Sequence, residues 1–356
     1  MMDGTAQKIV AAGMTWIERA HDVTGRRGIS AGYDLATGWQ PAYPETSGYL
    51  LPTMLRAARV LDRAPLADRA VEVGRWLREI QLPDGAFPNL GLEGQPAVFD
   101  AGQIVLGLVA LWRRTEDPAL LESAARAGRW VGDMQRADGS WLSHLGFPNT
   151  YSSRVAWALA ELSRATGDPA YARHAERSLD WILTRVRPDG WIDAMAFEEN
   201  RAPWTHTIGY ALRGLLRGGD LVGGDLGARC VAAASDCALR LADLRSPLHP
   251  LLPGEIGPGF EPYADYACLT GDAQMVVVWW DVAARRGDRA LAQRCLEVMD
   301  RLAALQVWQP LEPAAVGALP GSWPQSGAFE PNAFPIWATK FLVDAALATS
   351  RSPVAT

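Results

Sequence analysis

A repeated helical unit is the feature of this chain that most constrains its fold. Three stretches share a Trp, an Asp-Gly pair eight residues later, and then an aromatic residue. They read RAVEVGRWLREIQLPDGAF, SAARAGRWVGDMQRADGSW and HAERSLDWILTRVRPDGWI, with the Trp at positions 76, 130 and 181. Apolar residues at helical spacing before an Asp-Gly pair predict an amphipathic helix that ends at a turn. A repeat of about this length is typical of helical arrays and rings.

A second class of helix, more apolar and poorer in charge, alternates with the first. We expect these helices to start near residues 45, 100, 151, 205, 269 and 332. Amphipathic helices are predicted within 6–21, 67–81, 119–135, 170–186, 225–244 and 288–306. Because a charge-poor helix is buried on most sides, the apolar class belongs inside. The prediction is an all-α fold, an (α/α)6 toroid of six helical hairpins forming one domain over residues 1–356. An open solenoid is the alternative, but it would need capping repeats at both ends.

The composition and net charge limit the classes of binding partner and the cellular location that we expect for this protein. The 356 residues carry a net charge of −6 and show no basic run, so a nucleic-acid partner is not expected. The N-terminal stretch does not read as a signal peptide, and no apolar run is long enough to predict a membrane span. The four cysteines show no CxxC pairing, which favours reduced thiols and a cytoplasmic protein.

Long loops rich in Gly, Pro and aromatic residues precede each apolar helix. Function usually lies on such loops when a rigid scaffold holds them. In a closed ring the inner helices run parallel, so their N-termini meet at one mouth. The positive ends of the helix dipoles at this mouth favour an anionic ligand or a developing negative charge. We therefore expect the active site there.

Polar residues occupy the start of the apolar helix in every repeat, with aromatic residues nearby. They are Glu45, Asp100, Tyr151 with Arg154, His206, Thr270 with Gln274, and Asn332. A polar ring with an aromatic rim suits a saccharide or another small polar substrate better than a hydrocarbon. We assign candidate catalytic roles to Glu45, Asp100, His206 and Tyr151. Candidate substrate-binding roles go to Arg154, Gln274, Asn332, Trp39, Trp204 and Trp323.

Several of these residues have a second interpretation. Glu45 and Asp100 are also well placed to cap their helices, and His206 is equally consistent with a buried structural histidine. Arg154 lies on an apolar helix, where an unpaired charge is costly, so it should pair with a carboxylate or bind an anionic ligand. The five histidines lack the spacing of metal ligands, and neither a metal nor a cofactor is predicted.

The Asp-Gly turns resemble a motif of known toroids. QLPDGAF and QRADGSW are similar to the QW repeats of squalene-hopene and oxidosqualene cyclases and related prenyltransferase-type toroids, whereas RVRPDGW lacks the Gln. In that family the motif links helices and is not catalytic. The acidic DxDD and DDxxD motifs of such enzymes are absent from this chain.

The wider pattern resembles the six-hairpin glycosidase-like group, which includes unsaturated-glucuronyl hydrolases, sugar 2-epimerases and toroidal polysaccharide lyases. YPETSGYLLPT, FDAGQ, WTHTIGY, CLTGDAQ and PNAFPIWATKF are also similar to segments of uncharacterised bacterial toroids associated with polysaccharide or glycoconjugate biosynthesis. In the uronyl hydrolases, acidic residues at inner-helix starts perform acid/base chemistry. Glu45 and Asp100 match them by position in the repeat.

This resemblance implies a carbohydrate-active enzyme that uses carboxylates on a saccharide or glycoconjugate, an anionic one included. Hydrolase, lyase and epimerase chemistry all stay open. In a lyase or epimerase, His206 or Tyr151 would move the proton and Arg154 would hold a carboxylate. Two alternatives also stay open: a terpene- or polyketide-type cyclase with a modified acid, and a non-catalytic saccharide-binding toroid.

Overall fold

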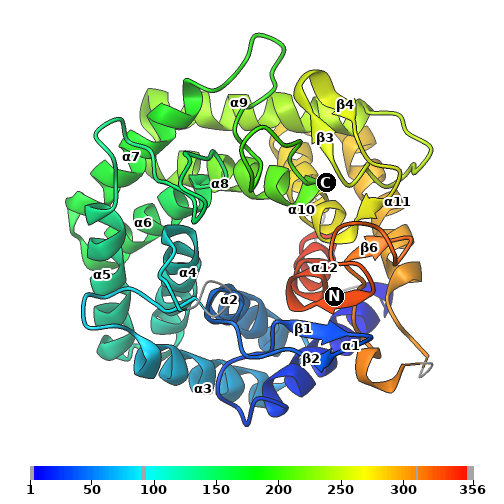
Figure 1. The fold of residues 1–356 in the computed structure, drawn as a ribbon, viewed down its shortest axis with the longest axis horizontal. Coiled ribbons are helices and arrows are strands. Elements are labelled where there is room, and N and C mark those ends of the chain that lie inside the picture. Colours follow the sequence, from blue (N-terminus) through cyan, green and yellow to red (C-terminus); the bar gives the residue numbers. More distant parts are fainter. Residues whose placement is uncertain (1–3, 90–93, 310–311, 351–356) are drawn as a thin grey trace.

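The computed structural model describes residues 4–89, 94–309 and 312–350, and within them twelve α-helices form a double ring (Figure 1). The inner ring consists of α2 (Pro44–Val60), α4 (Val98–Thr115), α6 (Ser153–Thr166), α8 (Thr205–Val222), α10 (Leu269–Arg286) and α12 (Ile336–Thr349). The outer ring consists of α1 (Gly4–Asp22), α3 (Ala64–Ile80), α5 (Pro118–Asp133), α7 (Pro169–Leu183), α9 (Gly224–Asp243) and α11 (Arg289–Leu305). The predicted all-α toroid is confirmed.

The two rings differ as their sequences predict. The outer helix α5 buries Leu120, Ala124, Ala127 and Val131, which lie three or four residues apart and therefore share one face. The inner helices are buried around most of their circumference. The inner neighbours α2 and α4 approach so closely that a Cβ on Gly107 would lie 2.0 Å from the carbonyl oxygen of Gly48. Larger residues there would force the two helices apart.

The two ends of the chain close the ring. Helix α12 packs against both α1 and α2, so the sixth hairpin combines the first helix of the chain with the last. Strand β1 (Gly32–Asp34) also pairs antiparallel with β7 (Ala333–Pro335), with Tyr33 opposite Phe334. Because the contacts continue around the whole circle, the open-solenoid alternative is wrong for this chain.

Short strands decorate the loops at one side of the ring. Strand β2 (Gly38–Trp39) pairs with β1, β3 (Ile256–Gly257) with β4 (Glu261–Pro262), and β5 (Ala267–Cys268) with β6 (Ser322–Trp323). Short 3-10 turns cover Pro258–Phe260 and Pro313–Ala315. On the opposite side, inner and outer helices are joined by tight turns such as Gly167–Asp168 and Gly287–Asp288. All six inner helices therefore begin at the side with the long loops.

Five of the six expected inner-helix starts agree with the structure to within two residues. The sixth is wrong, because α12 begins at Ile336 and not near Asn332. Residues 333–335 are held in β7 by strand β1, and Pro335 becomes the residue before the helix. A proline at the end of an extended segment is a typical helix boundary.

The Asp-Gly turns connect neighbouring outer helices. The Gln81 side-chain amide donates to the carbonyls of Gly85, in its own turn, and Ser123 on α5, both at 2.9 Å. Gln135 repeats the arrangement with Gly139 at 3.0 Å and His174 on α7 at 2.9 Å. The corresponding position in the third turn is Val186. These contacts give the turns a structural role; the likeness to cyclase motifs stays a prediction.

Two further expectations concern the cysteines and the membrane. The four cysteines are buried free thiols. Among the described helices, none is long and apolar enough to cross a membrane.

Candidate active site

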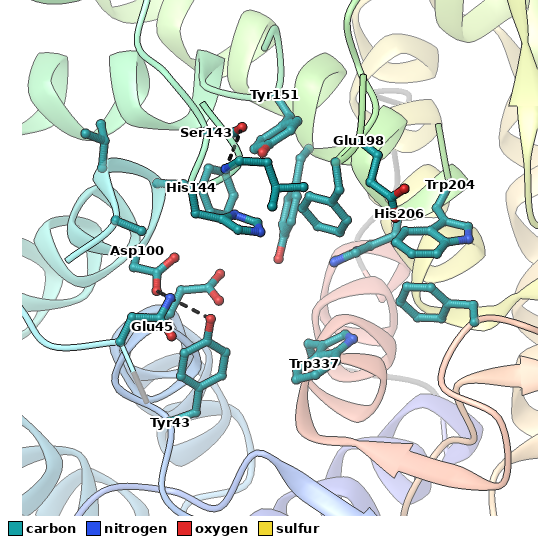
Figure 2. A pocket seen from close by; sticks show the side chains of 18 of the residues that line it. Tyr43, Glu45, Asp100, Ser143, His144, Tyr151, Glu198, Trp204, His206 and Trp337 are labelled. Carbon is teal, nitrogen blue, oxygen red and sulfur yellow. Dashed lines mark hydrogen bonds between the residues drawn. The ribbon is translucent and has the colours of Figure 1, made fainter. Parts of the chain in front are cut away.

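A cavity of about 580 Å³, which we call the front cavity, opens where the inner helices begin. Its walls combine helix starts from α2, α4, α8 and α12 with the long loops that precede them (Figure 2). Its aromatic lining consists of Tyr43, Tyr49, Phe99, Tyr151, Phe197, Trp204, Tyr210, Phe329 and Trp337. Its titratable lining also includes Glu45, Asp100, His144, Glu198, His206 and Glu330.

Glu45 and Asp100 lie next to each other on one wall of this cavity (Figure 2). Glu45 is the second residue of α2 and Asp100 the third of α4, and these helices are neighbours in the inner ring. The side-chain amide of Asn89 donates to Oδ2 of Asp100 at 2.6 Å, and the hydroxyl of Tyr43 donates to the same oxygen at 3.4 Å. Both donors stabilise Asp100 as a carboxylate.

Burial shifts both carboxyl groups toward their protonated forms. It raises the pKa of Glu45 well above the ordinary value, and the negative charge of Asp100 raises it further. Burial raises the pKa of Asp100 to about 7. Because the two groups interact, they titrate as a pair, and this pair holds a proton at neutral pH. A carboxyl group that can hold and release a proton near neutral pH is what acid/base catalysis requires.

The helix-cap interpretation does not describe Glu45. Helix α2 begins at Pro44, and the residue at the cap position is Tyr43, whose side chain makes no capping hydrogen bond. Its hydroxyl contacts Asp100. Both carboxyl groups therefore face the cavity, although a first-turn acid still benefits from the helix dipole.

His206 lies across the cavity from the carboxyl pair (Figure 2). Burial, together with the positive charges of Arg154 and Lys340, lowers the pKa of His206 to about 3, so the imidazole is neutral at pH 7. Its Nδ1 is hydrogen-bonded to the side-chain amide of Gln274. Gln274 therefore sits behind His206, outside the cavity lining, and fixes the ring with the other nitrogen facing the cavity.

Aromatic rings surround the polar groups. Tyr151 meets Phe99 and Phe197 edge to face, with ring centroids 5.1 and 5.3 Å apart. Trp204 meets Phe329 in the same way at 5.3 Å. Burial raises the pKa of Tyr151, so its hydroxyl stays protonated at neutral pH. Rings fixed in this way offer flat apolar faces beside hydroxyl donors.

The structure places Trp39, Trp323 and Asn332 outside the front cavity. Trp39 stacks on Trp16 with centroids 5.6 Å apart, and Trp323 lies under the guanidinium of Arg301 at 4.5 Å. Asn332 is an exposed turn residue with a φ of 56°. The side chains of Trp39 and Trp323 contact residues of the outer helices α1 and α11, and Asn332 precedes its helix by a whole strand. The candidate site excludes all three.

Arg154 also lies outside the front cavity. It is buried, and its guanidinium carbon sits 4.8 Å from the ring centre of Tyr210. It lines a second cavity on the other side of that ring. The structure thus places Arg154 away from the mouth, and its role in substrate binding stays a prediction.

The sequence prediction missed several lining residues. Tyr43 stands two residues before Glu45, so its position could have been noticed. Trp337 is the second residue of α12 and was hidden by the misplaced helix start. Asn89 and Phe197 come from irregular loops, where no periodic signal marks a residue that faces the cavity. The described residues contain no group of three His, Cys, Asp or Glu side chains that could hold a metal ion.

Comparison with known proteins identifies the fold. No protein-family model matches the sequence, and no curated protein is similar to it in sequence. Among solved structures, an unsaturated glucuronyl hydrolase specific for heparin superposes with a TM-score of 0.76 at 13% identity, covering 98% of this chain and 97% of the other. A cellobiose 2-epimerase from Bacillus thermoamylovorans gives 0.74 at 12% identity, with 94% and 96% covered. An unsaturated glucuronyl hydrolase from a Bacillus species, responsible for glycosaminoglycan degradation, gives 0.73 at 16% identity, with 96% of both chains covered. The chain therefore has the (α/α)6 toroid fold of these proteins.

Proposed function

We propose that this protein is a carbohydrate-active enzyme that converts a saccharide or glycoconjugate in the front cavity. The observation that carries the proposal is the buried pair of Glu45 and Asp100, which holds a proton at neutral pH and faces a neutral His206 across an aromatic cavity. Aromatic faces suit the apolar faces of sugar rings, while the polar groups suit hydroxyls. The fold shared with glucuronyl hydrolases and a sugar epimerase supports the same substrate class.

The two carboxyl groups have different surroundings, which favours different roles. Asn89 and Tyr43 both donate to Asp100, and the pKa of Glu45 is raised both by burial and by the charge of Asp100. Glu45 is therefore the proposed general acid, which donates its proton to the leaving oxygen of the substrate. Asp100 is the proposed general base, which takes a proton from the attacking water. This division describes a hydrolase.

Epimerisation is the second candidate, and the position of His206 favours it. A neutral imidazole opposite the acid pair could remove a proton from one face of a sugar carbon while Glu45 protonates the other side. Tyr151, which keeps its hydroxyl proton, would donate a hydrogen bond to a substrate oxygen. A lyase would use the same residues to remove a proton beside a uronic carboxylate.

The remaining expectations become part of the proposal. The polar lining of the front cavity supports a sugar more than the hydrocarbon of a terpene- or polyketide-type cyclase. A role in polysaccharide or glycoconjugate biosynthesis, and a cytoplasmic location, are proposed on the resemblance and the cysteine usage alone. The remaining alternative is a toroid that binds saccharides without converting them. The experiment must therefore distinguish binding from catalysis.

The test is a substrate panel with product analysis. Wild-type protein and Glu45→Gln are incubated with neutral disaccharides, uronic-acid oligosaccharides and the same oligosaccharides with an unsaturated end. Mass spectrometry detects hydrolysis as cleavage, and NMR spectroscopy detects epimerisation as a new sugar at unchanged mass. We expect one class to be converted by the wild type and not by Glu45→Gln. Binding of a saccharide without conversion by the wild type would make the protein a binding toroid and contradict the proposal.

A further inference from the structure

A second cavity of about 600 Å³, which we call the rear cavity, lies on the other side of the ring interior. All six inner helices line it, mostly with residues beyond their first turns. Three aromatic rings separate it from the front cavity: Tyr49, Tyr210 and Phe341. The ring of Phe341 lies 5.8 Å from Tyr49 and 5.9 Å from Tyr210, and Tyr49 lines both cavities.

Three cations converge on one carboxylate in the rear cavity. Oδ2 of Asp344 accepts from Nζ of Lys340 at 2.8 Å and from Arg213 at 3.4 Å, and Arg56 donates to Oδ1. Burial alone would raise the pKa of Asp344, but Arg56, Lys340 and Arg213 together hold it well below the ordinary value. Three basic side chains therefore donate to the one carboxylate of Asp344, although burial lowers the pKa of Lys340 well below its ordinary value.

Arg154 adds a fourth cation. Only 2% of its surface is exposed, and its Nε donates to Gln103 at 2.7 Å. Its Nη1 is buried and has no hydrogen-bond partner among the residues that the structure describes. Among carboxyl groups, Glu45 has the largest electrostatic effect on the pKa of Arg154. However, Glu45 lies beyond the aromatic rings, and its own raised pKa favours the neutral form.

Helix dipoles do not account for these charges. Arg154 is the second residue of α6 and Lys340 the fifth of α12, so both lie toward the positive ends of their helices, where a cation is disfavoured. By contrast, the cations at the rim have partners. Arg113 pairs with Glu161 at 2.7 Å, and Arg217 with Asp220 at 3.4 Å. Of the cations counted in the rear cavity, Arg154 and Lys340 are buried and the Arg213 side chain is 12% exposed, whereas the Arg56 side chain reaches the rim.

We propose that the rear cavity binds a phosphate group, either as free phosphate or as part of a larger phosphorylated molecule. Buried cations in excess are costly unless an anion neutralises them. A dianion balances the excess of Arg56, Arg154, Arg213 and Lys340 over Asp344 better than a single carboxylate does. Guanidinium groups match the oxygens of phosphate with paired hydrogen bonds. The cavity volume leaves room for an attached group beside Trp157 and Trp280.

The test is calorimetric titration of the whole protein at constant ionic strength, with inorganic phosphate and with glucose 6-phosphate. The test variant is Arg154→Gln. The matched control is Arg294→Gln, because Arg294 is also buried at 8% exposure, has unpartnered nitrogens among the described residues, and lines neither cavity. We expect saturable binding by the wild type and Arg294→Gln, and affinity at least tenfold weaker in Arg154→Gln. Equal affinity for both ligands indicates free phosphate; tighter binding of glucose 6-phosphate indicates a phosphorylated ligand.

Two results would overturn the proposal. One is the absence of saturable heat when either ligand is added to the wild type. The other is unchanged affinity in Arg154→Gln. If Arg154→Gln fails to fold, Arg213→Gln serves in its place, because Arg213 lines the same cavity and its side chain is 12% exposed. The readout needs no turnover, so its result is independent of the function proposed for the front cavity.

Discussion

The front and rear cavities occupy the same ring and have nearly the same volume, yet their buried acids end in opposite charge states. In the front cavity, Glu45 and Asp100 lack cationic partners at salt-bridge distance among the described residues, and burial drives them toward neutrality. In the rear cavity, Asp344 stays ionised because three cations surround it. The comparison shows that partners, more than depth, decide whether a buried acid keeps its charge.

This difference has a functional meaning. A carboxyl group whose pKa lies near neutral pH can exchange a proton during catalysis. A carboxylate kept ionised by neighbouring cations cannot. The rear cavity therefore offers fixed charge for binding, and the front cavity offers transferable protons. The rings of Tyr49, Tyr210 and Phe341 lie between the two cavities, and the charges of Arg154 and Lys340 still act across them on His206.

The largest expected effect comes from removing the proposed acid. Glu45→Gln should lower turnover by about a hundredfold to ten-thousandfold, the usual range for general acid–base catalysis, while the melting temperature holds or rises. The matched control is Asp272→Asn. Asp272 is a buried acid in the first turn of the inner helix α10, and burial raises the pKa of its carboxyl group to about 8. It lines neither cavity. Equal loss in both variants would refute a specific role for Glu45.

The next effect concerns the charge balance of the rear cavity. Asp344→Asn leaves Arg56, Lys340 and Arg213 without their carboxylate, which should lower the free energy of unfolding by about 3–5 kcal/mol. Denaturant titration measures this loss. Added phosphate should recover part of it in Asp344→Asn. A variant as stable as the wild type would mean that the three cations are not held by Asp344.

A smaller effect is a difference in the pH dependence of stability between the two cavities. Burial raises the pKa of Asp100 from 3.8, its value in the unfolded chain, to about 7 in the folded protein. Between these two pH values the folded protein holds a proton at Asp100 that the unfolded chain has lost. Stability therefore falls as the pH rises from about 4 to about 7, by up to roughly 4 kcal/mol for this group, and Asp100→Asn should reduce this fall, while Glu45 keeps contributing to it in the same direction. Asp344, with a lowered pKa, contributes in the opposite sense: its stabilisation is present above about pH 4 and is lost as the pH falls. Denaturant titrations at pH 5 and pH 8 should show Asp100→Asn gaining on the wild type at pH 8; an identical pH dependence would contradict the shift at Asp100.

The smallest effect lies outside both cavities. Gln135→Leu removes the side-chain hydrogen bonds to Gly139 and His174, which should cost about 1–3 kcal/mol of stability. Turnover and phosphate affinity should stay at wild-type values below the melting temperature. A loss of either function in folded Gln135→Leu would show that the turns influence the cavities.

Much of the fold could be predicted because each outer helix repeats the same apolar spacing and ends at an Asp-Gly turn. That repeat identified the ring, its two layers and the mouth where the helices begin. The prediction of one domain over residues 1–356 was not tested by these observations and stays a prediction. The start of α12 was misplaced because its boundary depends on pairing between β1 and β7, which lie about 300 residues apart.

The candidate site was only partly predictable. Glu45, Asp100, Tyr151, Trp204 and His206 do line one cavity, because equivalent helix starts meet at the same mouth. The direction of a long side chain could not be read from its position in the repeat. Arg154 begins its helix near the mouth but reaches past Tyr210 into the rear cavity. The excess of cations there became visible only when residues from α2, α6, α8 and α12 were brought together.

The most direct test of the two-cavity account is a crystal structure of Glu45→Gln grown with phosphate and soaked with the saccharide that the wild type converts. The account predicts the sugar in the front cavity, with its reacting bond beside Gln at position 45 and beside Asp100. It predicts the phosphate in the rear cavity, in contact with Arg154. A sugar bound in the rear cavity, or away from Asp100, would contradict the assignment of the front cavity as the site of chemistry.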